Sequence, residues 1–477
     1  MKIKRFILSL LLLVLVPVLV TGCRKGNKTP DAPPPSDTAT TSATSALANA
    51  SWPQWRGPTG QGLAVEAQGL PGIWAPDSPN VVWKTGIPGL GNSSPIVAKG
   101  RVFLTTAEGG AEQLERKVLG LDLESGEILW QTTLWTAPRE TKHRYNTSAA
   151  PTPAADDERV YAYFGAVLAA LDFDGNVVWQ KEVEANYLEF SRYAAVSSPI
   201  VVGDKIVLVQ DQESGKDDDV GWFATFDKAT GEELWRYTWD DTCCSYATPL
   251  QVGDRTFFAQ SGALAEYDLE AGKPLFWHDV RINQHVASLV ADGDMVCIAG
   301  GAHNVRNSSC VRLAEPGADP PLEVLWEDNR GAPETASPVL YNGLLYMVTE
   351  KGIMTCRNAE TGEVLWRRRL TRGRGSYSVS LLIADNKLYV SSSRGLTTVF
   401  ELVGEKIRLI GENHLGEGTN ASLAVAGDHL VIRTKHDLFL IAKEPEGYVA
   451  PPFEVTEEEM AADKAAREAD AQEAAQD

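Results

Sequence analysis

Short runs of β-branched and aromatic residues alternate with turn residues along most of the chain, from about Trp52 to Phe453. Gly, Asp and Asn separate these runs at intervals of about one strand length, and the period of an amphipathic helix is almost absent. Short apolar runs bounded by turn residues are typical of β-strands. The pattern therefore predicts an all-β body.

One phrase recurs within this body and divides it into repeats. Leu121–Trp130 reads LDLESGEILW, and related phrases occupy Phe226–Trp235 and Arg357–Trp366. Asp or Asn, followed by Ser or Thr, can hydrogen-bond the turn backbone, and Gly supplies the positive φ that the hairpin needs. The tryptophan that closes each phrase has a wide face that can pack against the neighbouring repeat. The predicted docking tryptophans are Trp83, Trp130, Trp179, Trp235, Trp277, Trp326 and Trp366.

The start of each repeat also follows a pattern, as in Ser93–Val97 and Ser197–Val201, which both read SSPIV. Eight such openings fit between residues 81 and 443 and give each repeat about 45 residues, the size of a four-stranded blade. The last repeat has room for three strands, whereas Val81–Thr85 is a lone strand ahead of the first repeat. The sequence therefore predicts an eight-bladed β-propeller of four-stranded antiparallel blades, closed by an N-terminal outer strand that completes the last blade.

The Asp-x-x-(Ser/Thr)-Gly-x-x-x-Trp phrase is similar to the tryptophan-docking motif of pyrroloquinoline quinone (PQQ) type propellers, and the resemblance covers nearly the whole body. It implies two possible roles. Quinoprotein dehydrogenases bind PQQ and calcium, whereas BamB-like lipoproteins of outer-membrane assembly bind no cofactor and act as scaffolds. Trp52–Pro58, WPQWRGP, resembles the opening of exported PQQ-like propeller proteins common in Planctomycetes. We expect Trp52 and Trp55 to plug one mouth of the ring rather than to bind a ligand.

The N-terminus has the pattern of an exported lipoprotein. Basic residues precede the apolar run Phe6–Val20, which is too short for an ordinary membrane-spanning helix and is typical of a signal peptide. The run ends in Val-Thr-Gly before Cys23, an arrangement that resembles the bacterial lipobox, in which the cysteine is acylated. We expect a lipid anchor at Cys23, and Arg24 after it, in place of Asp, favours the outer over the inner membrane.

Two segments of biased composition flank the body. Residues 24–51 contain 4 Pro, 9 Ser or Thr and 6 Ala, which predicts a disordered tether. Residues 454–477 are Ala-rich and hold 9 acidic and 2 basic side chains, which predicts an acidic tail. The predicted organisation is therefore a signal peptide over 1–23, the tether over 24–51, the propeller over 52–453 with its blades at about 81–443, and the tail over 454–477.

Charge and motifs exclude several function classes. The chain has 44 Lys and Arg against 64 Asp and Glu, a net charge of −20, which argues against a protein that coats nucleic acid. The sequence contains no Gly-x-Ser-x-Gly elbow, no phosphate-binding Gly-rich loop and no His-Glu-x-x-His pair. These absences argue against hydrolase and zinc-enzyme functions.

The loops that join one blade to the next are the predicted binding surface, because all eight emerge on the same face of a propeller. They carry polar residues such as Asn146, Thr419 and Asn420, and several arginines that could together bind an anion or a carboxylate. Alternatively, each arginine pairs with a local acid such as Asp240, Asp241, Asp328 or Glu334. The candidate arginines are Arg144, Arg192, Arg330, Arg372 and Arg374.

The cysteines leave two questions open. Cys243 and Cys244 are adjacent in a predicted mouth loop, and the resemblance to quinoprotein alcohol dehydrogenases implies that such a pair could form a disulfide against bound PQQ. The calcium ligands, the catalytic base and the Trp platform of those enzymes have no matching motif in this chain. Cys297 and Cys310 lie on successive predicted strands and form either a disulfide or two buried thiols. Cys356 is then an unpaired core residue.

Taken together, these patterns predict a lipid-anchored propeller of the cell envelope that faces the periplasm, is monomeric, and binds envelope proteins as a non-catalytic scaffold without cofactor or metal. Partners would bind at the loop mouth or add a strand to a blade edge. The alternative is a PQQ- and calcium-dependent quinoprotein oxidoreductase, for which Cys243 and Cys244 are the candidate cofactor contacts.

Overall fold

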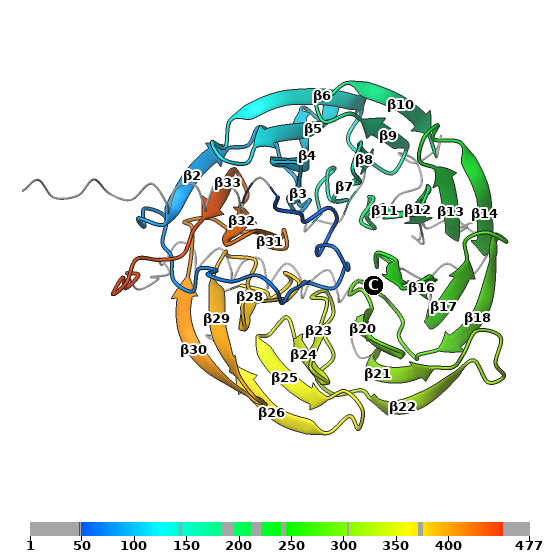
Figure 1. Ribbon diagram of the computed structural model, residues 1–477. Coiled ribbons are helices and arrows are strands. Elements are labelled where there is room, and N and C mark those ends of the chain that lie inside the picture. Colours follow the sequence, from blue (N-terminus) through cyan, green and yellow to red (C-terminus); the bar gives the residue numbers. More distant parts are fainter. Residues whose placement is uncertain are drawn as a thin grey trace, which may run out of the picture. The chain divides into compact units, whose positions relative to one another are not determined.

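The computed structural model describes residues 47, 49–140, 142, 146–183, 194–210, 221–239, 245–260, 262–302, 305–370 and 375–451. These residues form eight sheets arranged in a ring, each built on four antiparallel strands (Figure 1). In blades 1 to 7 the four strands follow each other in chain order from the centre of the ring to its rim. The predicted all-β, eight-bladed propeller is therefore confirmed.

Each blade begins with a short inner strand and ends with an outer strand at the rim. Blades 1 and 2 contain β3 (Ile96–Ala98), β4 (Arg101–Gly109), β5 (Leu114–Asp122), β6 (Ile128–Ala137), β7 (Ala154–Ala155), β8 (Val160–Tyr163), β9 (Val167–Leu171) and β10 (Val177–Glu182). Blades 3 and 4 contain β11 (Ile200–Val202), β12 (Lys205–Gln210), β13 (Gly221–Asp227), β14 (Glu233–Trp239), β15 (Leu250–Val252), β16 (Arg255–Gln260), β17 (Ala263–Asp268) and β18 (Lys273–Asp279). Blades 5 and 6 contain β19 (Val290–Asp292), β20 (Met295–Ala302), β21 (Val305–Leu313), β22 (Leu322–Asp328), β23 (Val339–Tyr341), β24 (Leu344–Val348), β25 (Ile353–Asn358) and β26 (Val364–Arg369). Blades 7 and 8 contain β27 (Leu382–Ala384), β28 (Lys387–Ser391), β29 (Thr397–Val403), β30 (Lys406–Asn413), β31 (Ala424–Ala426), β32 (His429–Arg433), β33 (Asp437–Ile441) and β2 (Val81–Gly86), and β1 (Leu63–Ala64) joins the inner edge of blade 7.

Blade 8 closes the ring with strands from both ends of the propeller. Its sheet order is β2-β33-β32-β31, and β2 pairs antiparallel with β33, with Trp83 opposite Leu440. The strand that precedes blade 1 in the chain is therefore the outer strand of blade 8, as predicted. This closure ties the first and last repeats together and leaves no gap in the ring.

A girdle of hydroxyl groups links the inner strands around the centre. In each link the backbone N–H of a Ser or Thr just before an inner strand donates to the hydroxyl oxygen of the equivalent residue in a neighbouring blade. Because buried backbone N–H groups need partners, the girdle satisfies donors that the short inner strands leave unpaired. The links run from Ser94 to Thr152 (2.9 Å), Thr152 to Ser198 (3.0 Å), Ser198 to Thr248 (3.1 Å), Thr248 to Ser288 (2.9 Å), Ser288 to Ser337 (3.0 Å), Ser337 to Ser380 (3.2 Å) and Ser422 to Ser94 (2.9 Å).

Tryptophan side chains link the outer strand of one blade to the neighbouring blade. Six of the seven predicted docking tryptophans donate from indole Nε1 to a backbone carbonyl in the next blade. The ring of Trp83 lies so close to Gly126 that a Cβ there would come within 2.5 Å of it, and Gly126 also has a positive φ. Glycine is therefore required at this turn for both reasons. The bonds run from Trp83 to Leu123 (3.0 Å), Trp130 to Phe173 (2.9 Å), Trp179 to Lys228 (3.1 Å), Trp235 to Leu269 (2.7 Å), Trp326 to Ala359 (2.7 Å) and Trp366 to Glu405 (2.7 Å).

Trp277 differs from these six. Its side chain is 42% exposed, and its ring lies edge-on to Trp239 of the neighbouring outer strand. Blade 5 follows it in the chain and lacks the turn phrase, having a Pro-rich connection after Leu313 instead. Nη1 of Arg255 donates to the carbonyl of Ala314 in that connection (3.1 Å). At the junction between blades 4 and 5 this arginine contact and buried apolar packing are present in place of a docked tryptophan.

A strap, defined as residues 50–76, crosses one end of the ring and is drawn in blue over its middle in Figure 1. Trp52, which is 2% exposed, bridges to Val97 of blade 1, and the carbonyl of Pro53 accepts from Ala155 of blade 2. Further along the strap, β1 pairs in parallel with β27 of blade 7. Other strap contacts reach blades 5 and 6: Gln61 Oε1 accepts from the Ala291 backbone N–H, and Arg56 Nη2 donates to the Pro338 carbonyl. The strap is thus part of the core of the ring.

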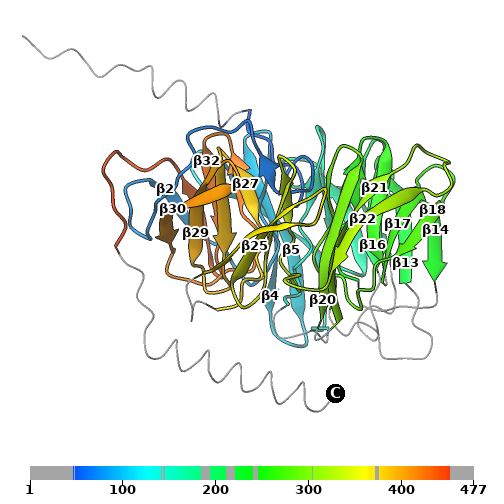
Figure 2. The same cartoon turned by 90° about the horizontal axis from the view of Figure 1, so that it is seen from below.

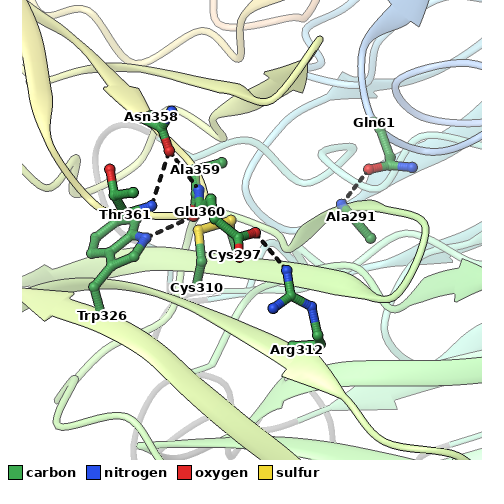
Figure 3. The surroundings of a disulfide bond; sticks show 10 residues. All are labelled: Gln61, Ala291, Cys297, Cys310, Arg312, Trp326, Asn358, Ala359, Glu360 and Thr361. Atoms are coloured by element: carbon green, nitrogen blue, oxygen red, sulfur yellow. Dashed lines mark hydrogen bonds and ion pairs between the residues drawn. A yellow bond between two sulfur atoms is a disulfide. The ribbon is translucent and has the colours of Figure 1, made fainter.

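Cys297 and Cys310 form a disulfide between β20 and β21, where they lie directly opposite each other (Figure 3). Both side chains are fully buried, next to the turn that receives Trp326. The structure thus selects the disulfide from the two possibilities that the sequence left open. Cys356 is a buried free thiol, and burial raises its pKa to about 12.

Candidate functional site

The two faces of the ring have different connections. The strap bonds to Ala155, Ala291 and Ala384, which lie at the ends of inner strands, beside the turns that lead into the second strand of each blade. The connections from each outer strand to the next blade enter the inner strands at their other end. We call this opposite side the loop face. Figure 2 shows the strands running between the two faces, with the blue strap at one of them.

A pocket of about 290 Å³, which we call the mouth pocket, opens on the loop face beside blade 8. Three blade-to-blade connections form it, those between β2 and β3, β6 and β7, and β30 and β31. The turns after β28 and β32 complete it. Its lining residues are Leu90, Gly91, Asn92, Lys142, Asn146, Thr147, Ser393, Gly418, Thr419, Asn420, Ala421, Thr434 and Lys435.

Hydrogen bonds between neighbouring loops hold the mouth pocket open. The backbone N–H of Asn92 donates to Thr147 Oγ1 (2.9 Å), which joins two of the blade connections. The backbone N–H of Lys435 donates to the carbonyl of Gly418 (2.9 Å), and that of Thr419 donates to the carbonyl of Ser393 (3.1 Å). The pocket walls therefore support each other without help from a ligand.

The lining is basic and contains no acidic side chain among the described residues. Lys142 Nζ donates to the Asn146 carbonyl (2.8 Å), and Lys435 is exposed. Burial lowers the pKa of Lys142, nearby Arg139 lowers it further, and Glu140 opposes the change. The pocket thus presents two basic side chains on a protein whose net charge is −20.

A buried guanidinium adds to this charge. Arg433, at the end of β32, is 2% exposed, and its Nη1 donates to the Ser93 carbonyl (2.9 Å), Ser93 Oγ (2.7 Å) and the Thr105 carbonyl (2.9 Å). None of these acceptors is charged, and burial lowers the pKa of Arg433 to about 9. Gly91, which lines the pocket, lies against this guanidinium, because a Cβ at Gly91 would come within 2.6 Å of Nη2. Arg433 therefore lies directly behind the pocket wall.

Of the predicted arginines, only Arg330 is among the described residues, and it pairs with a local acid. Its Nε donates to Asp328 Oδ1 (3.1 Å), and Arg357 Nη2 donates to Asp328 Oδ2 (2.7 Å). These residues line a separate pocket of about 580 Å³ formed by the outer parts of blades 5 and 6. Arg330 is thus not part of the mouth pocket. Arg144, Arg192, Arg372, Arg374, Cys243, Cys244 and Cys23 lie outside the described residues.

The Asp328 pair predicts an acid-sensitive contribution to stability. Burial alone would raise the pKa of Asp328, but hydrogen bonds from Arg330 and Arg357 outweigh it and hold the pKa at about 2. Since an unfolded Asp has a pKa of about 3.9, the stabilisation is complete above that value and is lost as the pH falls towards 2. Asp328→Asn should therefore cost about 1–2 kcal/mol near neutral pH and progressively less below about pH 4. Urea denaturation at a series of pH values measures this, and a cost that stays constant down to pH 2 would contradict it.

The basic residues of the mouth pocket were not predicted from the sequence, although Asn146, Thr419 and Asn420 were. Lys435 lies in the turn between the second and third strands of blade 8, and such turns open on the same face as the blade connections. The position of Lys435 in such a turn is therefore a signal that the sequence contains. Arg433 also left a signal, because it is a charged residue that directly follows the apolar run Leu430–Ile432.

The described residues of the mouth pocket do not fit PQQ with calcium. Calcium requires several oxygen ligands, usually including carboxylates, and the lining has no Asp or Glu. It also has no aromatic ring on which a quinone could stack. Across all described residues, no group of three or more His, Cys, Asp or Glu side chains is arranged to hold a metal ion. In the same part of the chain, no helix has the length and apolar character needed to cross a bilayer.

Comparison with solved structures finds the same fold in proteins of low sequence identity. The chain is 10% identical to a europium-containing methanol dehydrogenase, covering 84% of this chain and all of that one, with a TM-score of 0.61. It is 11% identical to quinohemoprotein alcohol dehydrogenase ADHIIG from Pseudomonas putida HK5, covering 87% and 83% of the two chains, with a TM-score of 0.58. At these identities the likeness shows the fold alone.

BamB from Moraxella catarrhalis is 16% identical over 66% of this chain and 83% of that chain, with a TM-score of 0.46. No curated protein matches the sequence. In a family comparison two segments, residues 50–218 and 219–447, fit the family described as outer membrane protein assembly factor BamB. These segments span well over half of the chain, and the protein therefore belongs to that family.

Proposed function

We propose that this protein is a non-catalytic scaffold of the cell envelope that binds protein partners through its loop face. The observation that carries the proposal is the family match over residues 50–447. The site geometry supports it, because the mouth pocket is small, polar and basic, and so suits a charged group on the surface of another protein.

The direction in which the chain enters the ring supports the choice of face. Trp52 leads into the strap, and Leu47 and Ala50 just before it are already buried in the core. The described chain therefore enters the ring on the strap side, and an anchor at Cys23 would be joined to it through residues that precede Leu47. The loop face would remain accessible to partners.

Site-specific photo-cross-linking in envelope vesicles tests this proposal. A photoreactive amino acid replaces Asn420 on the loop face or, as a matched control, Val65, which is 44% exposed on the strap. We expect discrete products with envelope proteins, identified by mass spectrometry, from position 420 and not from position 65. Products of equal yield from both positions, or none from position 420, would contradict a loop-face scaffold.

A second assay addresses the oxidoreductase alternative, which the adjacent Cys243 and Cys244 favour. The purified full-length protein is incubated with PQQ and calcium, and quinone absorbance and dye-linked alcohol oxidation are measured. Stoichiometric PQQ binding together with alcohol oxidation, both lost in Cys243→Ala, would show that the protein is an oxidoreductase. That result would overturn the scaffold proposal. We expect neither binding nor oxidation.

A further inference from the structure

The described lining of the mouth pocket carries basic side chains and no acidic one, and the nearby Glu417 carboxylate already accepts from Thr434 Oγ1 (2.8 Å) and the His436 backbone N–H (3.0 Å). Lys142 and Lys435 line the pocket, and Arg433 lies behind its wall. An anion bound among these groups would gain favourable Coulomb energy from each of them. The protein as a whole is strongly acidic, so an anion is attracted more strongly to this basic pocket than to the surrounding surface.

We propose that the mouth pocket binds a carboxylate group from an acidic segment of a partner protein. This inference rests on the proposed scaffold function and names the chemistry that the partner presents. Ammonium groups and side-chain amides form charge-assisted hydrogen bonds to carboxylates, which are stronger than those between neutral groups.

Donors for such a group are available at the pocket. An ammonium group has three donors, and Lys142 Nζ uses one of them on the Asn146 carbonyl. The side chain of Lys435 is exposed and has no acidic partner among the described residues. Asn420 Oδ1 accepts from Ser378 Oγ (3.2 Å), which orients the amide and leaves its Nδ2 donors for a ligand. Two lysines and one amide therefore offer hydrogen bonds from different sides of the pocket.

Arg433 strengthens the case because none of its hydrogen-bond acceptors among the described residues is an anion. Buried charges in proteins are normally paired, yet Arg433 Nη1 contacts only neutral oxygens of Ser93 and Thr105. Its Nη2 lies against Gly91, whose other side faces the pocket. A carboxylate in the pocket would lie across this glycine from the guanidinium and supply the missing negative charge without displacing any of the existing hydrogen bonds.

The size and edge of the pocket favour a peptide side chain over a larger ligand. A volume of about 290 Å³ has room for one or two side chains. Leu90 at its edge is 43% exposed and can cover the apolar stem of a Glu residue. Backbone connections on three sides restrict access to a group that extends from a surface.

Fluorescence anisotropy with labelled hexaglutamate tests the inference on the full-length protein in detergent. We expect saturable binding that weakens as NaCl is raised, because salt screens exposed charges. Lys142→Gln and Lys435→Gln should each weaken binding about tenfold, since each removes one charge-assisted contact. Lys406→Gln, which changes an exposed lysine of β30, is the matched control and should leave the affinity unchanged. Thermal unfolding of every variant checks that the fold is intact.

Several results would overturn the inference. The inference is wrong if hexaglutamate does not bind, or if it binds the two lysine variants as tightly as the unaltered protein. It is also wrong if inorganic phosphate displaces hexaglutamate at an ionic strength where NaCl has no effect. Binding that appears only after the acidic residues of 454–477 are neutralised would assign the pocket to the chain's own tail instead of a partner. Failure here together with retained cross-linking at Asn420 would reject the carboxylate chemistry alone, whereas loss of both would also reject the scaffold.

Discussion

Replacing Trp83 with alanine is expected to lower the free energy of unfolding by about 3–5 kcal/mol, the range for a large buried aromatic side chain. Trp83 is 9% exposed, and its Nε1 donates to the Leu123 carbonyl of blade 1. Its ring also fills the space above Gly126. Because Trp83 lies on β2 of blade 8, the substitution weakens the junction that closes the ring. Urea denaturation followed by circular dichroism measures the loss.

Trp277→Ala is the matched control, since it removes the same side chain from an equivalent outer strand. Trp277 is 42% exposed, and no indole hydrogen bond to blade 5 is present among the described residues. The expected cost is therefore about 1 kcal/mol or less. Equal losses from the two substitutions would show that stability depends on the tryptophan itself and not on its docking to the next blade.

The contrast between these two residues shows what the repeat pattern can and cannot predict. The tryptophan of one repeat and the turn phrase of the next are both visible in the sequence, and Trp83, Trp179 and Trp235 dock where that phrase follows. Trp277 closes its own repeat in the usual way, but the connection after Leu313 lacks the turn phrase, and its Gly317 has no side chain packed against it. The tryptophan of a repeat can be recognised in the sequence, but whether it docks also depends on the turn of the next repeat.

The closure of blade 8 was predictable, but the path of the strap was not. Val81–Thr85 has strand character and stands alone, which leaves one vacant position in the ring for it. The strap contacts depend on single residues that follow no repeat. Arg56 bonds to Pro338 and Gln61 to Ala291, both more than 200 residues away in the chain. Nothing in the local pattern specifies such distant partners.

The sequence predicted which face of the ring carries the candidate site but not which residues form it. Sequence reasoning placed the blade connections together because propeller topology requires it, and Asn146, Thr419 and Asn420 do meet at the mouth pocket. It could not decide which side chains converge, since Arg330 lies instead with Asp328 on the outer part of the ring. Convergence depends on loop conformation and on local ion pairs, which have no periodic signal.

A chain that begins at Ile87 is expected to lose cooperative folding altogether, because residues 47–86 are structural parts of the ring. They supply β2, the outer strand of blade 8, and the strap. Besides Trp83, the deletion removes Trp52 and Trp74, which are 2% and 1% exposed, and burial of each contributes about 3–5 kcal/mol. The sum of these losses reaches the entire stability of a typical domain, about 5–15 kcal/mol.

The control for this truncation is a chain that begins at Leu47, which removes residues 1–46 and keeps every described contact of the strap and β2. It should unfold in one transition at the same temperature as the full-length protein. The chain that begins at Ile87 should show no sharp transition in calorimetry, because blade 8 would retain three strands, β33 would have an exposed apolar edge, and the end of the ring covered by the strap would be open. A cooperative transition within a few degrees of the control would mean that the remaining strands form a stable open ring, and that neither β2 nor the strap is needed for closure.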